Sequence, residues 1–188
     1  FVPFVPRVGS LQKNRETWAD LKQIGVLLKQ PTLLRLNLGI FSLHLALMAT
    51  FVVIPTMLSG QLGICGDDLW WLYLVLLVGG FIAMLPVMIL GEKYQLQKLA
   101  FVSAIGCMTV AMLVLGREQG VILTLAMLLL FFAAFNLLEA TLPSWLSKAC
   151  PAGSRGTAMG IYSTSQFMGA FVGGILGGWS LQQFGSTG

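Results

Sequence analysis

The sequence predicts an all-α integral membrane protein, built as a bundle of several membrane-spanning helices. Hydrophobic residues make up 56% of its 188 residues and charged residues only 10%, whereas charged side chains normally make up about a quarter of a globular chain. The mean hydropathy is +0.84. Five stretches reach, within tolerance, the length of about 20 mostly apolar residues that a spanning helix needs. Barrel strands would be shorter and would alternate in polarity.

The chain divides into an amino-terminal linker and a membrane bundle. Residues 1–31 are expected to form a cytoplasmic linker, and Pro3 and Pro6 break its first apolar run, so it is no cleavable signal. Residues 18–28 repeat apolar side chains at helical spacing, which suits a short helix on the membrane surface; an ordinary solvated linker helix fits the same pattern. Residues 32–188 are expected to form the bundle, with spans at about 33–58, 69–90, 99–115, 121–145 and 158–184.

Basic residues fall mainly on one side of these spans. Ten of the 11 lysines and arginines precede or begin the first span or lie in the second and fourth connections, and Arg117 alone lies on the other side. The positive-inside rule therefore predicts a cytoplasmic amino terminus for this chain. The excess of basic residues behind the net charge of +4 is explained by this topology. No nucleic-acid partner is expected, because the basic residues lie at membrane edges and form no aromatic-interleaved patch.

No pattern in the sequence indicates catalysis or metal binding. The chain has one histidine and three cysteines, without closely spaced cysteines or a His-Glu-x-x-His pattern. No metal site or cofactor is therefore expected. An enzyme is not expected either, because an intramembrane hydrolase needs a nucleophile or a metal ligand set.

Aromatic residues gather at the predicted outer ends of two spans. Trp70, Trp71 and Tyr73 begin the second span, and Trp179 lies near the end of the fifth. Tryptophan and tyrosine are enriched at membrane–water interfaces. These four rings are therefore expected to form an outer aromatic belt and to contact no substrate.

Two ionisable residues lie deep within the spans, Glu139 in the fourth and His44 in the first. Burying such groups in a bilayer is costly, which makes them functional candidates. Asn136, Glu139 and Pro143 share one helical face, and Pro143 leaves the Glu139 carbonyl without its helical donor and bends the helix. A lone histidine on an apolar helix is often only a hydrogen-bonded packing residue. Alternatively, His44 faces Glu139 across one cavity, with Asn37 on the same side of its helix.

The fifth span carries seven glycines between Gly156 and Gly178. Several recur at every fourth position, and in a membrane such a stripe lets a neighbouring helix approach closely. Gln166 lies almost on the same stripe and is a candidate for lining a cavity. Simple helix packing explains the stripe as well, and so does a non-transporting sensor or assembly subunit held by glycine-lined faces.

The stretch FNLLEATLPSWLSKACPAGSRGTAMGIYSTSQFMGAFVGGILGG, residues 135–178, resembles the tenth and eleventh helices of major facilitator superfamily transporters. It is similar to bacterial inner-membrane proteins in the drug:proton antiporter branch of that superfamily. The basic linker and a seventh helix with HLALMATFVVIP extend the resemblance over most of the chain. The loop GEKYQLQKLA keeps Gly91 and Lys98 of the family's loop pattern, but Gln95 and Leu96 stand where Asp and Arg are expected.

The resemblance implies a partial carboxyl-terminal half of that fold, comprising helices seven to eleven. The amino-terminal half and the twelfth helix are then missing from this chain, and transport requires the missing half. The implied protein is a multi-pass secondary active transporter of the bacterial inner membrane. Its expected partners are the lipid bilayer, protons and a small-molecule substrate, moved in proton-coupled antiport by alternating access.

The residues expected to carry transport fall into three sets. The proton-coupling pair is Glu139 and His44, with Pro143 as the helix kink. The substrate cavity is expected to be lined by Asn37, Asn136 and Gln166. The cytoplasmic loops are expected to contain Gly91, Lys93, Lys98 and Arg155.

Overall fold

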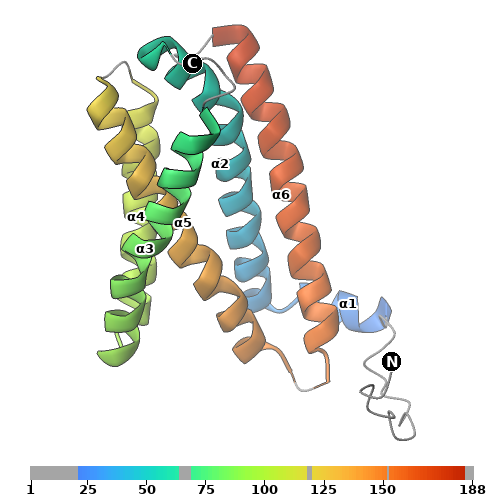
Figure 1. The fold of residues 1–188 in the computed structure, drawn as a ribbon. Coiled ribbons are helices and arrows are strands. Elements are labelled where there is room, and N and C mark those ends of the chain that lie inside the picture. The colour runs from blue at the N-terminus through green and yellow to red at the C-terminus, as the bar shows by residue number, and fades with distance from the viewer. Residues whose placement is uncertain (1–20, 64–68, 118–119, 152, 185–188) are drawn as a thin grey trace, which may run out of the picture.

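The computed structural model describes residues 21–63, 69–117, 120–151 and 153–184, and every regular element within them is an α-helix (Figure 1). The all-α fold predicted from the sequence is confirmed. Most of the predicted linker, residues 1–20, lies outside the described residues. The helices are α1 (Leu21–Leu28), α2 (Pro31–Leu62), α3 (Leu69–Lys93), α4 (Gln97–Leu115), α5 (Val121–Ala149) and α6 (Arg155–Phe184).

The long helices continue beyond the predicted spans by up to about one turn. In α2, Pro31 occupies the first turn, where its missing N–H does no harm. Gly63 ends the same helix in a left-handed conformation, with φ of 63°, and its N–H donates to the Ser59 carbonyl. The helix bounds therefore follow backbone signals, whereas the predicted spans followed the limits of the apolar runs.

Four helices of the described segments, α2 to α5, are long and apolar enough to cross a membrane. α6 has 30 residues, but its glycines and polar side chains make it less apolar than the other four. It runs beside α2 over most of its length (Figure 1). The fifth span stays a prediction, supported by the length of α6 and by its place beside α2.

The helices form two groups (Figure 1). α2 and α6 pack against each other as one pair, and α3, α4 and α5 form the second group. α5 also packs against α2 and thereby joins the groups. The short helix α1 lies next to the first turns of α6 and α2.

The contact between α2 and α6, which we call the glycine seam, depends on three glycines of α6. A β-carbon added to Gly169, Gly173 or Gly177 would lie under 3.0 Å from backbone atoms of α2. The α2 residues that these glycines meet, in order, are Phe41, Leu45 and Ala49. The two helices are therefore parallel, and their backbones touch directly, which in lipid favours extensive dispersion contact.

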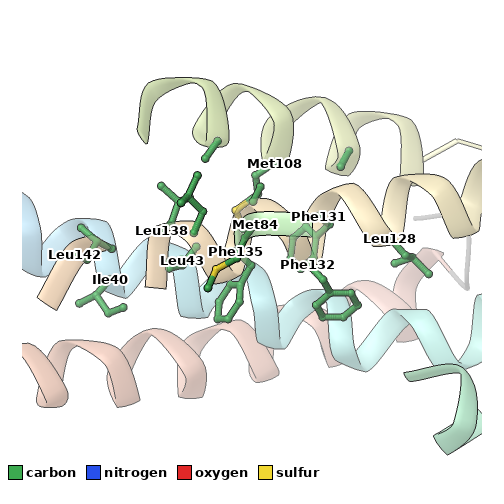
Figure 2. Packing of buried hydrophobic residues seen from close by; sticks show 14 of the residues in the cluster. Ile40, Leu43, Met84, Met108, Leu128, Phe131, Phe132, Phe135, Leu138 and Leu142 are labelled. Atoms are coloured by element: carbon green, nitrogen blue, oxygen red, sulfur yellow. The ribbon is translucent and has the colours of Figure 1, made fainter. Parts of the chain in front are cut away.

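The second group packs mainly through large side chains (Figure 2), with one close backbone approach, at Gly80 of α3 against Phe132 of α5. Phe131 and Phe132 of α5 are fully buried, and their rings meet edge to face with centroids 5.5 Å apart. Met84 of α3 and Met108 of α4 belong to the same buried cluster, together with Leu128 of α5. α5 is thus the central helix of this group, and it presents buried side chains to both of its neighbours.

One of the four rings assigned to the outer belt lies elsewhere. Trp70, Trp71 and Trp179 are all more than half exposed, as a belt at the interface requires. Tyr73 instead stacks on Phe51 of α2, with ring centroids 5.5 Å apart, and its hydroxyl is buried. Tyr73 therefore packs into the bundle, on nearly the opposite helical face from Trp71. The belt stays a prediction, which the exposure of the three tryptophans supports.

Candidate functional site

Three polar side chains from three helices meet inside the bundle: His44 of α2, Glu139 of α5 and Gln166 of α6. The Gln166 Nε2 atom lies 2.8 Å from His44 Nε2 and donates a hydrogen bond to Glu139 Oε1 at 3.2 Å. His44 Nδ1 lies 3.8 Å from Glu139 Oε2. We call these three residues the polar cluster.

Each side chain is brought to the polar cluster by the packing of its helix. Gln166 lies three residues before Gly169, so the glycine seam holds α6 close enough for the amide to reach His44. Phe135, one turn before Glu139 on α5, packs its ring edge-on against His44 with centroids 5.6 Å apart. The seam therefore positions Gln166, and the contact between α2 and α5 positions Glu139.

The backbone of α5 is interrupted beside Glu139. Pro143 lies inside the helix and has no N–H to donate to the Glu139 carbonyl. The Thr141 hydroxyl donates to the Leu137 carbonyl at 2.6 Å, a type of bond that often bends helices. The carboxylate therefore lies where the helix lacks one of its own backbone hydrogen bonds.

The members of the cluster differ in exposure. The His44 side chain is 12% exposed and that of Glu139 is 34% exposed. The imidazole is thus largely enclosed by the described helices, whereas the Glu139 side chain keeps an open side, although its Oε2 atom is buried. A glutamate side chain with an open side can exchange a proton with its surroundings, and the enclosed imidazole then responds to that charge.

Several buried polar atoms lack a hydrogen-bond partner in the described part of the chain. In the cluster these are His44 Nδ1 and Glu139 Oε2. Outside it, the corresponding atoms belong to Asn37, Tyr73, Asn136 and Tyr162. Most buried polar groups in proteins are paired, so these atoms are available to a polar ligand or to water.

The two asparagines predicted to line the cavity lie near the cluster but outside it. Asn37 is 6% exposed and lies two turns before His44 on α2. Asn136 lies three residues before Glu139 on α5, on the same helical face. Neither side chain has a hydrogen bond to the cluster within the described residues. Their predicted role in binding substrate stays a prediction.

Sequence reasoning did not single out Tyr162. Its side chain is 3% exposed, and it lies one turn before Gln166 on α6, which places both on one face. The hydroxyl is among the buried polar atoms without a partner. The spacing of four residues from Gln166 is the sequence signal that could have identified it.

Gly91, predicted in a cytoplasmic loop, is buried near the end of α3. Its carbonyl accepts a hydrogen bond from the Leu96 N–H at 2.8 Å, and a β-carbon on it would meet the Ala100 side chain at 3.5 Å. Gln95, in the same turn, has a φ of 58°. Gly91 therefore belongs to the packing of the turn between α3 and α4.

The basic residues predicted in the loops lie away from the cluster. Lys93 and Lys98 are exposed at the turn between α3 and α4. Arg155 begins α6, and its guanidinium donates to the Ser147 carbonyl in the last turn of α5, at 3.5 Å. A cation at that position interacts favourably with the helix C-terminus.

Two cavities of the bundle lie away from the polar cluster. A cavity of about 290 Å³ between α2, α4, α5 and α6 has mostly apolar walls. A smaller one of about 140 Å³ lies between α3, α4 and α5 and includes Glu92 and Lys148. Neither is lined by His44, Glu139 or Gln166. Within residues 21–63, 69–117, 120–151 and 153–184, no three His, Cys, Asp or Glu side chains gather at a possible metal site.

Known proteins resemble this chain over almost its full length. The model of the Major Facilitator Superfamily matches residues 6–187. Inner membrane transport protein YajR of Escherichia coli (strain K12) is 42% identical over 185 residues, which cover 98% of this chain and 40% of that protein. An uncharacterized transporter of Buchnera aphidicola subsp. Acyrthosiphon pisum is 32% identical over 174 residues, 92% of this chain and 44% of the relative.

A third relative shows the same pattern of coverage. An uncharacterized transporter of Buchnera aphidicola subsp. Baizongia pistaciae is 31% identical over 166 residues, 85% of this chain and 41% of the relative. The chain therefore spans about two fifths of the length of the curated relatives it matches.

Proposed function

Because this chain belongs to the Major Facilitator Superfamily, as the resemblance of residues 135–178 predicted, we propose that it is part of a proton-coupled secondary active transporter. In this proposal the chain supplies helices seven to eleven, and an amino-terminal half completes the path. A small molecule and protons are exchanged across the bacterial inner membrane by alternating access. The observation that carries the proposal is the polar cluster, in which His44, Glu139 and Gln166 meet within apolar helices.

Glu139 is the proton-coupling carboxylate in this proposal. It is the only acidic residue deep within any predicted span, and holding a charge at that depth is costly. When the ionised carboxylate takes up one proton it becomes a neutral carboxyl group. Its attraction to His44, 3.8 Å away, is then lost. The two protonation states therefore favour different arrangements of α5 relative to α2, as alternating access requires.

The substrate occupies the open side of Glu139 in this proposal. Asn136 shares a helical face with Glu139, and its amide nitrogen is buried without a partner in the described residues. The Asn37 amide oxygen is also buried without a hydrogen-bond partner in the described residues. A substrate that bonds to these groups competes with the proton for the neighbourhood of Glu139, and this competition is the basis of antiport.

The test uses the full-length transporter in inside-out membrane vesicles with an imposed pH gradient. A panel of fluorescent cationic and neutral dyes is screened, and a dye that the native protein accumulates serves as the probe. Glu139→Gln keeps the size and hydrogen bonding of the side chain but cannot titrate. The variant is expected to abolish pH-driven accumulation of the dye, while movement of the dye down its own gradient continues.

The matched control is Glu92→Gln, at an exposed carboxylate near the end of α3. This variant is expected to accumulate the dye like the native protein. Thermal stability is measured in parallel, because removal of one partner from a buried charged pair is strongly destabilising. A stable Glu139→Gln protein with native pH-driven accumulation contradicts the proposal.

A further inference from the structure

Gln166 lies between the two ionisable side chains, and we propose that it is a positioning residue that holds His44 in the tautomer with its proton on Nδ1. The meaning of this tautomer for transport rests on the proposed function. The contacts that carry the inference do not depend on that function. They are two distances from the Gln166 Nε2 atom, 2.8 Å to His44 Nε2 and 3.2 Å to Glu139 Oε1.

The first step follows from the hydrogen-bonding inventory of the three groups. A glutamine amide has one NH₂ group with two hydrogens to donate and one oxygen that accepts, whereas an ionised carboxylate only accepts. When Glu139 is ionised, the group of Gln166 that faces it is therefore the NH₂. The same nitrogen faces His44 Nε2, and an amide nitrogen cannot accept. His44 Nε2 must accept the second hydrogen, so it carries no proton.

The second step assigns the remaining ring nitrogen. A neutral imidazole carries one proton, so a bare Nε2 places that proton on Nδ1. His44 Nδ1 faces Glu139 Oε2 at 3.8 Å, which is longer than a hydrogen bond. The carboxylate at this distance does not fix the tautomer by itself. The shorter contact with Gln166 does, and as a result the ring directs its N–H toward Glu139.

The third step concerns the charged imidazole. Protonation of His44 at Nε2 would place two donors face to face at the 2.8 Å contact. Gln166 would then have to turn its amide, so that its oxygen faces His44 and its NH₂ leaves the imidazole. Protonation of His44 is therefore coupled to the orientation of the Gln166 amide on α6, which lies beside the glycine seam. The amide itself does not titrate.

Within the described residues, the other titratable and charged groups form no hydrogen bond with these three side chains. The Tyr162 hydroxyl on α6 lies close enough to Glu139 for an electrostatic interaction, and Tyr73 on α3 stacks on Phe51, seven residues beyond His44. The cations of α2, α5 and α6 lie at least nine residues from the cluster members, which is about 13 Å or more along the helices. These cations are Arg35, Lys148 and Arg155.

The test exploits the single histidine of the chain. The full-length transporter, with His44 as its only ¹⁵N-labelled histidine, is reconstituted in lipid bilayers and studied by solid-state NMR at about pH 9, above the usual pKa of histidine. The shifts and couplings of the ring nitrogens identify which one carries the proton. The native chain is expected to show His44 with the proton on Nδ1 alone.

Two substitutions of Gln166 are expected to change the tautomer of His44 in different ways. Gln166→Met has a similar length but no N–H donor and only a weak sulfur acceptor, and it is expected to give a mixture of the two tautomers. Gln166→Glu presents only acceptors at this pH, and it is expected to move the proton to Nε2. The control is Thr164→Val on the same helix, where the lost hydroxyl donates to the Gly160 carbonyl; it should keep the native tautomer.

The inference is overturned if the native chain carries the proton on Nε2, or if Gln166→Met keeps it on Nδ1 alone. The first outcome needs no variant, so a folding defect cannot mask it. Neither outcome bears on the dye experiment with Glu139→Gln, which tests coupling in the full-length transporter. Conversely, loss of the proposed function would leave the tautomer of His44 as the NMR experiment finds it.

Discussion

The glycine seam between α2 and α6 and the contact between α3 and α5 hold helices together in different ways. At the seam, backbone meets backbone, because Gly169, Gly173 and Gly177 carry no side chain. Between α3 and α5 the backbones approach this closely at one glycine, Gly80, where an added β-carbon would lie 2.9 Å from the Phe132 carbonyl carbon. Large side chains fill the rest of that contact, and Phe131 and Phe132 are fully buried. A seam of this kind leaves no flexible atoms to adjust, whereas a side-chain interface can change rotamers. The seam therefore fixes the distance between two helices more strictly.

The polar cluster lies where these two modes of packing meet. His44 and Gln166 belong to helices joined by the seam, and their contact is short, at 2.8 Å. Glu139 belongs to the other group, and its contacts with them are longer, at 3.2 Å and 3.8 Å. The imidazole of His44 and the amide of Gln166 therefore form one unit. In the proposed transport cycle, Glu139 is the member that changes its distance from that unit.

The largest expected effect comes from filling the seam. Gly173→Ala adds a β-carbon that would lie 2.8 Å from the Leu45 Cα and 2.9 Å from its carbonyl carbon. Backbone atoms cannot move aside as side chains do, so the helices must separate. We expect a loss of about 3 kcal/mol, at the upper end of the usual cost of overpacking. The loss is measured as a fall in apparent Tm of the purified protein in detergent.

The control for the seam is Gly174→Ala, one residue further along α6. A β-carbon there meets no described atom within 4 Å. This variant should keep the native Tm or exceed it slightly, because alanine is the better helix former. Equal losses from the two substitutions would contradict the seam as the source of strict spacing.

The sequence was sufficient to predict the helices but not how they pair. Long apolar runs predicted α2 to α5, because a bilayer demands about 20 such residues. Helix ends were missed by up to about one turn, since Pro31 and Gly63 act on the backbone independently of hydropathy. The glycine stripe predicted close packing of α6. The partner helix of α6 and the register between the two helices depend on contacts with Phe41, Leu45 and Ala49. No local sequence pattern in α2 predicts these contacts.

The candidate site was predictable to the extent that charge in a membrane is rare. Glu139 and His44 stood out because few ionisable residues lie within the spans. Gln166 was expected only as a cavity residue, whereas the structure places its amide between the other two. That placement depends on the register of α6 along α2. Tyr73 was grouped with Trp70 and Trp71 because they are close in sequence, but its ring packs against Phe51 of α2, and closeness in sequence is no guide to helical face.

A smaller effect is expected from emptying the side-chain interface. Phe132→Ala removes a ring that meets Phe131 edge to face at 5.5 Å and Phe51 of α2 at 5.8 Å. Large-to-small changes of this kind cost about 3–5 kcal/mol in water-soluble cores. We expect about 2 kcal/mol here, because lipid is as apolar as the core and only the lost packing counts.

The measurement for Phe132→Ala is again the apparent Tm in detergent. Phe167→Ala on α6 is the matched control, because its side chain is 72% exposed and should contribute little to packing. A loss from Phe132→Ala that exceeds the loss from Gly173→Ala would reverse the order of the two interfaces. The difference drawn between seam and side-chain packing would then be wrong.

The smallest effect is expected at the junction between the groups, where α2 meets α5. A β-carbon on Gly39 would meet the Leu142 Cδ2 atom at 3.4 Å and Cδ1 at 3.9 Å, which is ordinary van der Waals contact with a side chain that can rotate. Gly39→Ala is therefore expected to change the free energy of unfolding by less than about 0.5 kcal/mol, because slight crowding offsets the helix propensity of alanine. Gly106→Ala on α4, where a β-carbon meets no described atom within 4 Å, is measured beside it as the control for propensity alone. If Gly39→Ala instead lowers the Tm as much as Gly173→Ala does, the junction is as strictly spaced as the seam, and Glu139 cannot be the member of the cluster that moves.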